Sequence, residues 1–86
     1  MNNKVLIKLL VIDCDISFDV FIPVNEIMWK VKKLLTKSVS DLTGISSYLN
    51  KDFILINKDN SRIYNNNEII IDTDIRNGTE IIMLSN

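Results

Sequence analysis

Two features of the sequence carry groups that could do chemistry, and the first is a lone cysteine. Cys14 lies between Asp13 and Asp15. Two neighbouring carboxylates disfavour the negatively charged thiolate, which is the reactive form of cysteine. We therefore expect Cys14 to be an incidental residue at a hairpin tip and not a nucleophile.

The second feature is the acidic run of Asp72, Thr73 and Asp74, whose oxygens could contact Ca²⁺. The run lacks the other spaced ligands and the distal glutamate of an EF-hand loop, so solvated turn residues are the better interpretation. With one cysteine and no histidine, the chain lacks the usual ligands of structural zinc and the commonest general base. No Gly-rich phosphate loop and no nucleophile with a partnered base is present. We predict no catalytic residues, no metal, no cofactor and no enzymatic activity.

Length, composition and charge limit the remaining classes of function. The chain has 86 residues, of which 47 % are apolar, so we expect residues 1–86 to form a single domain with one core. The formal charge of −1 argues against nucleic acid as a partner, because duplex binding needs a basic face. The apolar run at residues 5–12 is short and contains Lys8, which fits neither a membrane span nor a signal peptide. We expect a cytoplasmic protein without direct membrane insertion.

The first half of the chain predicts a hairpin followed by one long helix. Residues 5–12 are apolar and β-branched, residues 17–22 alternate in polarity, and Pro23 ends the second strand because it has no N–H. A helix is predicted over residues 25–43, with Asn25 as its N-cap and Gly44 as the residue that closes it. The apolar stripe that should face the sheet comprises Ile27, Val31, Leu34, Leu35 and Leu42, flanked by Met28 and Val39.

The second half predicts short strands and turns. Strands are expected over residues 53–56, 62–64 and 79–84, while residues 68–75 fit either extended chain or a tight turn. A helix with one apolar stripe must cover one face of a sheet, so this order of elements predicts an α+β fold. The arrangement is a ubiquitin-like β-grasp: a mixed sheet of four or five strands, one long helix across one face, and the first and last strands parallel at the centre.

The sheet face that the helix leaves open is the first candidate for a functional surface. Lys8 and Glu80 must point to solvent, so alternation places apolar neighbours of the same phase outward with them. A contiguous apolar patch is typical of an interface with a protein partner or in a homodimer, although ordinary β-rich composition would also leave apolar residues there. The predicted interface residues are Leu6, Leu10, Phe21, Leu55, Ile82 and Leu84, with Ile12 beside them.

A second candidate surface lies on the helix. Trp29 falls opposite the predicted stripe and near Lys33, and an exposed tryptophan is a common binding anchor. Packing of Trp29 against the hairpin or a loop is the alternative interpretation. The lysines on this side are expected to form a solvated face.

The end of the chain bears on covalent functions of this fold, because β-grasp proteins that act covalently use a C-terminal Gly-Gly. The sequence ends in residues 83–86 (MLSN), of which only residues 85 and 86 follow the last predicted strand, and the nearest glycine, Gly78, lies before that strand. We therefore expect neither conjugation nor sulfur transfer.

Three segments suggest a family: residues 19–23 (DVFIP), the amphipathic helix that follows, and residues 75–82 (IRNGTEII). Together they resemble the YukD/EsaB family, small ubiquitin-like proteins associated with bacterial type VII (Esx, WXG-protein) secretion. The resemblance covers nearly the whole chain. It implies a cytoplasmic accessory protein that binds components of the secretion machinery, peripheral to a membrane complex, with no catalytic residues.

Two other functions stay open at this point. One is a small ubiquitin-like subunit of a multicomponent enzyme of the diiron monooxygenase type, which would bind a large catalytic chain. The other is a truncated sulfur-carrier-like protein, which would require a missing C-terminus. Neighbouring genes for a secretion ATPase, a hydroxylase or an adenylating enzyme would distinguish the three.

Overall fold

The N-terminal residues form the predicted hairpin. In the computed structural model, which describes residues 3–86, β1 (Lys4–Val11) pairs antiparallel with β2 (Ile16–Pro23). The short 3₁₀ helix η1 (Ile12–Cys14) joins the strands, and Asp15 turns the chain in the left-handed conformation with a φ of 53°. The second strand ends at its proline, as predicted.

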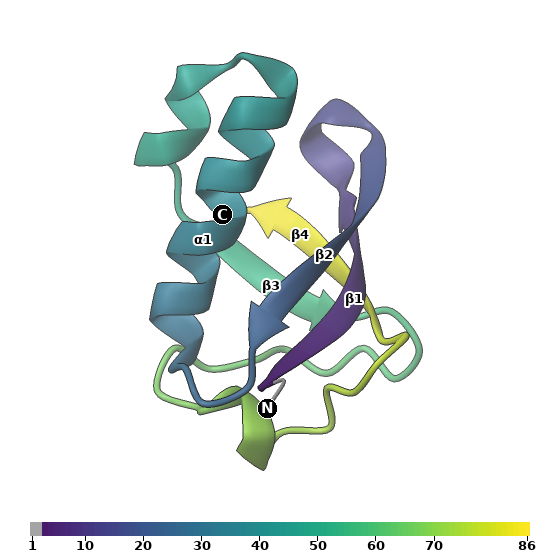
Figure 1. The fold of residues 1–86 in the computed structure, drawn as a ribbon. Coiled ribbons are helices and arrows are strands. Elements are labelled where there is room, and N and C mark those ends of the chain that lie inside the picture. Colours follow the sequence, from purple (N-terminus) through teal and green to yellow (C-terminus); the bar gives the residue numbers. More distant parts are fainter. Residues whose placement is uncertain (1–2) are drawn as a thin grey trace.

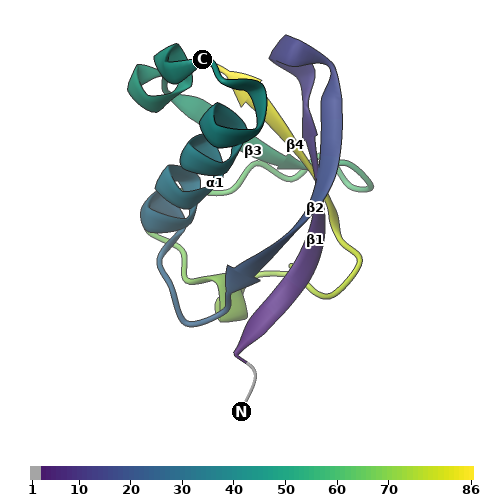
Figure 2. The same cartoon turned by 45° about the horizontal axis from the view of Figure 1, so that its top comes forward.

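Two later strands complete a four-stranded mixed sheet (Figure 1). β3 (Phe53–Asn57) pairs antiparallel with β4 (Glu80–Ser85), and β4 pairs parallel with β1, which gives the strand order β2-β1-β4-β3. Helix α1 (Met28–Thr43) lies across one face of this sheet (Figure 2). The predicted α+β arrangement, with parallel strands at its centre, is confirmed.

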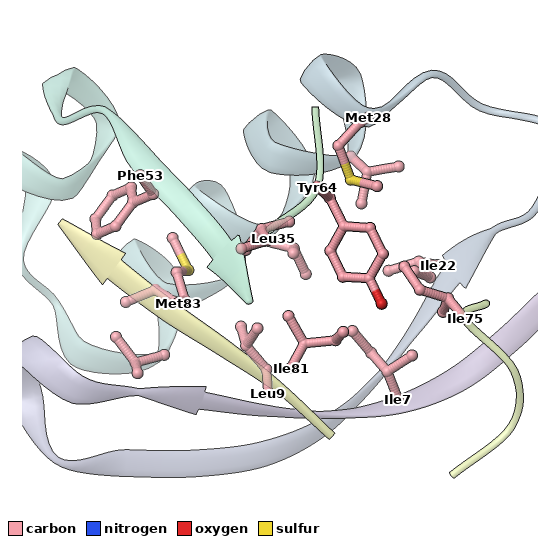
Figure 3. Close-up of a cluster of buried hydrophobic side chains, with 14 of the residues drawn as sticks. Ile7, Leu9, Ile22, Met28, Leu35, Phe53, Tyr64, Ile75, Ile81 and Met83 are labelled. Carbon is pink, nitrogen blue, oxygen red and sulfur yellow. The ribbon is translucent and has the colours of Figure 1, made fainter. Parts of the chain in front are cut away.

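Every second residue of β1, β2 and β4 faces the helix, as predicted, and these residues form the inner layer of the core. Lys8 and Glu80 point away from the helix, so the apolar residues beside them in the chain point toward it. Figure 3 shows these side chains packed between the sheet and α1. The buried residues of β1, β2 and β4 are Ile7, Leu9, Val11, Ile22, Ile81 and Met83.

The helix begins at Met28, later than predicted, and Asn25 is not its N-cap. The first turn has no side-chain cap. Instead, the N–H of Met28 donates to the carbonyl of Glu68 at 2.7 Å, and the N–H of Trp29 donates to the carbonyl of Asn66 at 3.2 Å. Distant backbone carbonyls therefore satisfy N–H groups that a polar N-cap would otherwise bind.

The helix face that covers the sheet also differs from the predicted one. The prediction is wrong for Leu34 and Leu42, whose exposed fractions are 47 % and 61 %. The buried face is turned toward Thr36 and Ser40. The hydroxyl of Thr36 donates to the carbonyl of Lys33 at 2.9 Å, so its burial leaves no unpaired polar group. The buried helix residues are Met28, Val31, Leu35, Thr36, Val39 and Ser40.

β3 has the opposite phase from the predicted one. Leu55 is only 2 % exposed, so the prediction that it lies on the open face is wrong. Asn57 is buried on the same side, while Ile54 and Ile56 point to the open face. A polar residue can occupy this core position because its side-chain amide donates to the hydroxyl of Tyr64 at 3.1 Å.

Both glycines of the chain occupy positions with a positive φ. Gly44 follows α1 with a φ of 74° and closes the helix, as predicted. Gly78 has a φ of 89° in the turn before β4, and its N–H donates to the carbonyl of Leu6 at 2.8 Å. The side-chain oxygen of Asn77 accepts the N–H of Leu6, also at 2.8 Å. This turn therefore continues the pairing of β1 where β4 has not yet begun.

A polar network holds the loop between β3 and β4. The hydroxyl of Tyr64 donates to the carboxylate of Asp74 at 2.5 Å, and Arg62 forms ion pairs with Asp74, at 3.3 Å, and with Glu68. Burial, with the bond to Asp74, raises the pKa of Tyr64 to about 12, and the same bond lowers the pKa of Asp74. The N–H of Tyr64 donates to the carbonyl of Leu55 at 3.1 Å, so the network fixes this loop against the outer edge of β3.

Candidate protein-binding surface

The open face of the sheet carries a row of apolar side chains from three strands. Leu10 of β1 pairs in register with Ile82 of β4, and Ile82 pairs with Ile56 of β3. Ile63 lies opposite Ile56 in an isolated β-bridge and extends the row past the sheet edge. Directly paired residues project to the same side of a sheet, so these side chains form one apolar line.

A second apolar row lies beside the first, nearer the C-terminal end of β4. Ile54 of β3 pairs with Leu84 of β4, and both side chains are partly exposed. Ile12, at the same end of the molecule, has an exposed fraction of 53 %. We call the two rows the open-face patch, which consists of Leu10, Ile54, Ile56, Ile63, Ile82 and Leu84.

A row of charges forms one border of the open-face patch. Lys8 pairs in register with Asp19 of β2 on one side and with Glu80 of β4 on the other. The carboxylate of Glu80 lies 3.8 Å from the ammonium of Lys58. The four charges alternate in sign, and covering them with a partner would cost desolvation energy. The charged row, Asp19, Lys8, Glu80 and Lys58, therefore limits the patch.

Leu6 and Phe21 lie beyond the charged row. They pair with each other across β1 and β2, and Phe21 has an exposed fraction of 58 %. The predicted interface is therefore divided. Leu10, Ile82 and Leu84 belong to the open-face patch, whereas the other two outward residues form a separate pair.

Three members of the patch, Ile54, Ile56 and Ile63, were not among the predicted interface residues. Residues 53–56 are all apolar, so no charged residue inside this stretch indicates which side faces water. The missing signal is Lys58, which directly follows β3 and shares the phase of Ile54 and Ile56. Extending the alternation to this lysine would have placed both isoleucines on the open face.

The second predicted surface, around Trp29, lies on the helix side of the molecule. Trp29 is 38 % exposed, and the ammonium groups of Lys30 and Lys33 lie 5.5 Å and 5.1 Å from its ring centroid. These cation–π contacts order the three side chains relative to one another. Since α1 covers the inner face of the sheet, this surface is separate from the open-face patch.

The residues considered first for chemistry have structural contacts. Cys14 is half-buried and packs against the hydrophobic core, and Asp74 belongs to the polar network. Thr73 is buried, and its hydroxyl donates to the carbonyl of Ile70 at 2.6 Å. Within residues 3–86, no three Cys, Asp or Glu side chains lie close enough together to hold a metal ion. Over the same range, no helix has the length and apolar character required to span a membrane.

Comparison with known proteins gives similarity in structure and none in sequence. No protein-family model matches the chain, and no curated protein matches it. A chain of the MycP5-free ESX-5 inner membrane complex, State II, superposes with a TM-score of 0.77 at 12 % sequence identity. The match covers 99 % of this chain and 21 % of that chain, so the present chain spans about a fifth of the length of that protein.

Two further structures are matched along most of their own length. Ubiquitin from Caldiarchaeum subterraneum has a TM-score of 0.66 at 12 % identity, covering 96 % of this chain and 94 % of that chain. A chain of the toluene 4 monooxygenase HD complex with inhibitor 4-bromobenzoate has a TM-score of 0.69 at 7 % identity, with coverages of 96 % and 99 %. At such identities the similarity concerns the fold alone. The chain has the ubiquitin-like β-grasp fold.

Proposed function

We propose that this chain is a non-enzymatic, protein-binding accessory of a bacterial type VII secretion system, of the YukD/EsaB kind. In this proposal it acts in the cytoplasm, at the periphery of a membrane complex, and binds its partner through the open-face patch. The likeness to a chain of the ESX-5 inner membrane complex carries the proposal. The resemblance of residues 19–23 and 75–82 to YukD/EsaB proteins supports it.

The open-face patch is well suited to protein binding. Covering its apolar side chains removes them from water, which contributes roughly 25 cal/mol per Å². Leu10, Ile82 and Ile56 lie on adjacent paired strands, so backbone hydrogen bonds hold them in place before a partner arrives. A preorganised surface loses little conformational entropy on binding. Without a partner, two copies would cover the same patch in a symmetric homodimer.

The proposal is tested by affinity capture from the native host with the parent and with Ile82→Asp. Ile82 lies at the centre of the patch on an inner strand of the sheet, and its side chain points away from the core. An aspartate there is buried without a partner charge only when another protein covers it. We expect this variant to keep the circular dichroism spectrum of the parent and to lose the secretion components that the parent captures. Any dimer seen for the parent in sedimentation should be lost as well.

Phe21→Asp is the matched control for this experiment. Phe21 lies on the same sheet face but beyond the charged row, so capture by this variant should equal capture by the parent. An equal loss of captured proteins in both variants would contradict the conclusion that the charged row separates Phe21 from the open-face patch. Recovery of proteins of an unrelated assembly by the parent would contradict the secretion proposal.

A second candidate function is a small subunit of a multicomponent monooxygenase. It is supported by the likeness to a chain of the toluene 4 monooxygenase complex, 99 % of which is covered by the match. Such a subunit would form a stoichiometric complex with a large catalytic chain. The same capture experiment would then recover a hydroxylase in place of secretion components.

A further inference from the structure

A groove runs between α1 and the segment from the 3₁₀ helix η2 (Ser46–Asn50) to the start of β3. Its volume is about 400 Å³. Trp29 and Leu49 form apolar walls and are 38 % and 55 % exposed. We call it the lysine groove, and the lining residues that matter below are Trp29, Lys32, Lys33, Leu49, Lys51 and Asp52.

The lysine groove has an excess of positive charge. Lys32, Lys33 and Lys51 line it together with a single carboxylate. The ammonium of Lys33 lies 5.1 Å from the ring centroid of Trp29, and that of Lys51 lies 5.1 Å from the ring centroid of Tyr48. Among residues 3–86, none of these three lysines forms an ion pair. Aromatic rings orient ammonium groups without neutralising them, so the groove can accept an anionic ligand.

Lys32 is the lysine most affected by its surroundings. Partial burial lowers the pKa of Lys32, and the attraction of the Asp52 carboxylate offsets this effect only in part. A partly desolvated ammonium without a close counter-ion is stabilised when an anion approaches it. Lys32 therefore adds to the preference of the groove for negative charge.

The groove continues along the outer edge of β3. A second hollow of about 250 Å³ shares Lys32, Asp52, Phe53 and Asn66 with the first. This second hollow reaches Tyr64, where the edge of β3 is already paired. Two hollows that share a wall form an elongated site, which fits an extended peptide better than a single small anion.

We propose that the lysine groove binds an acidic segment of a partner protein, with carboxylates beside the three lysines and an apolar side chain against Trp29 and Leu49. A membrane surface or a nucleic acid fits less well, because the site is concave and the whole chain carries a charge of −1, whereas extended polyanions need a broad basic face. The lysine groove contains no residue of the open-face patch, and the second hollow meets that patch only at Ile54 and Ile63. The inference therefore concerns a second binding surface and goes beyond the proposed function.

Trp29 is the only tryptophan of the chain, so its fluorescence reports directly on the groove. The probes are short synthetic peptides rich in glutamate around a central leucine or phenylalanine, with control peptides that carry glutamine in place of glutamate. We expect the glutamate peptides to change Trp29 emission saturably and to bind at least about tenfold more tightly than the glutamine peptides. Added salt should weaken this binding.

The double variant Lys33→Glu with Lys51→Glu should lower the affinity for the glutamate peptides at least about tenfold, because it reverses two charges of the groove. Lys37→Glu is the matched control, since Lys37 lies on the same helix outside the groove and pairs with Asp41 at 3.4 Å. It should bind the peptides like the parent. Circular dichroism confirms that the variants are folded.

Three results would overturn the inference. They are no change of Trp29 emission with any glutamate peptide, equal weakening in Lys37→Glu, and tighter binding of phosphatidylserine vesicles or a DNA duplex than of the peptides. Ile82→Asp should leave peptide binding unchanged, because Ile82 lies outside the groove. A failure of the open-face proposal is thereby distinguished from a failure of the groove.

Discussion

Both faces of the four-stranded sheet are rich in apolar side chains, yet α1 covers only one of them (Figure 2). On the inner face Leu9, Leu55 and Ile81 are at most 2 % exposed, and the apolar layer is continuous. The open face is interrupted by the charged row, and its apolar residues stay partly exposed. Charge at a few positions, more than apolar content, therefore distinguishes surface from core in this chain.

The largest expected effect comes from placing the same charge on each side of β3. Leu55→Asp should destabilise the fold by more than about 4 kcal/mol, because it buries an unpaired carboxylate. Ile56→Asp, one residue further on the open face, should cost about 1 kcal/mol. Urea denaturation followed by circular dichroism measures both. Equal stabilities of the two variants would show that the phase of β3 is wrong.

The next largest effect compares two adjacent leucines of α1. Leu35 is 1 % exposed, so Leu35→Ala should cost about 2–5 kcal/mol in the free energy of unfolding. Leu34 is 47 % exposed, so Leu34→Ala should cost less than about 1 kcal/mol. Thermal and urea denaturation of both variants tests which face of the helix meets the sheet. A larger loss of stability in Leu34→Ala than in Leu35→Ala would show that the helix meets the sheet through the apolar stripe predicted from the sequence.

A smaller effect is expected from the polar network, which holds Ile63 beside the open face. Asp74→Asn should cost about 1 kcal/mol at neutral pH, because the carboxylate is partly exposed and its bonds to Tyr64 and Arg62 are correspondingly weakened by solvent. Native-state hydrogen exchange should show faster opening of residues 58–76 than of β1 and β4. Equal exchange rates in all these segments would contradict the view that the polar network holds residues 58–76 independently of the central strands.

The same network should respond to pH in a direction set by its pKa shifts. The pKa of Asp74 is lowered in the folded state. Its contribution to stability is therefore present above its ordinary pKa near 4 and is lost as pH falls through the lower pKa of the folded state. The pKa of Tyr64 is raised to about 12, so its contribution is lost as pH rises from about 10 toward 12. The free energy of unfolding should be measured against pH for the parent and both variants. Asp74→Asn should lack the part of the acid-side decrease that Asp74 causes, and Tyr64→Phe should lack the part of the alkaline-side decrease that Tyr64 causes.

The smallest effect is expected at the charged row. Glu80→Gln removes the ion pair with Lys58, which is partly exposed, and should cost less than about 1 kcal/mol. A loss of several kcal/mol in urea denaturation would mean that the row stabilises the fold and does more than separate the apolar surfaces.

The element order, the mixed sheet and the phases of β1, β2 and β4 could be predicted because Lys8, Asp19 and Glu80 indicate the solvent side of each strand. β3 has no such residue within its apolar stretch, and Asn57, its polar member, is buried against Tyr64. Local pattern alone therefore did not determine which side of β3 faces water.

The start of α1 and the border of the interface depend on contacts between residues far apart in sequence. Met28 is capped by the carbonyl of Glu68, so the local N-cap signal at Asn25 is overridden. The separation of Phe21 from Leu10 depends on the pairing of Lys8 with both neighbouring strands. The lysine groove likewise joins α1 to the start of β3, a pairing that no single stretch of sequence contains.

The claim that the open-face patch is the binding surface is tested most directly by photo-crosslinking in the native host. A photoreactive amino acid replaces Ile82 in one variant and Leu42, an apolar residue on the exposed side of α1, in another. We predict a specific adduct with a secretion component from position 82 and none from position 42. Adducts with the same component from position 42, without any from position 82, would contradict the account.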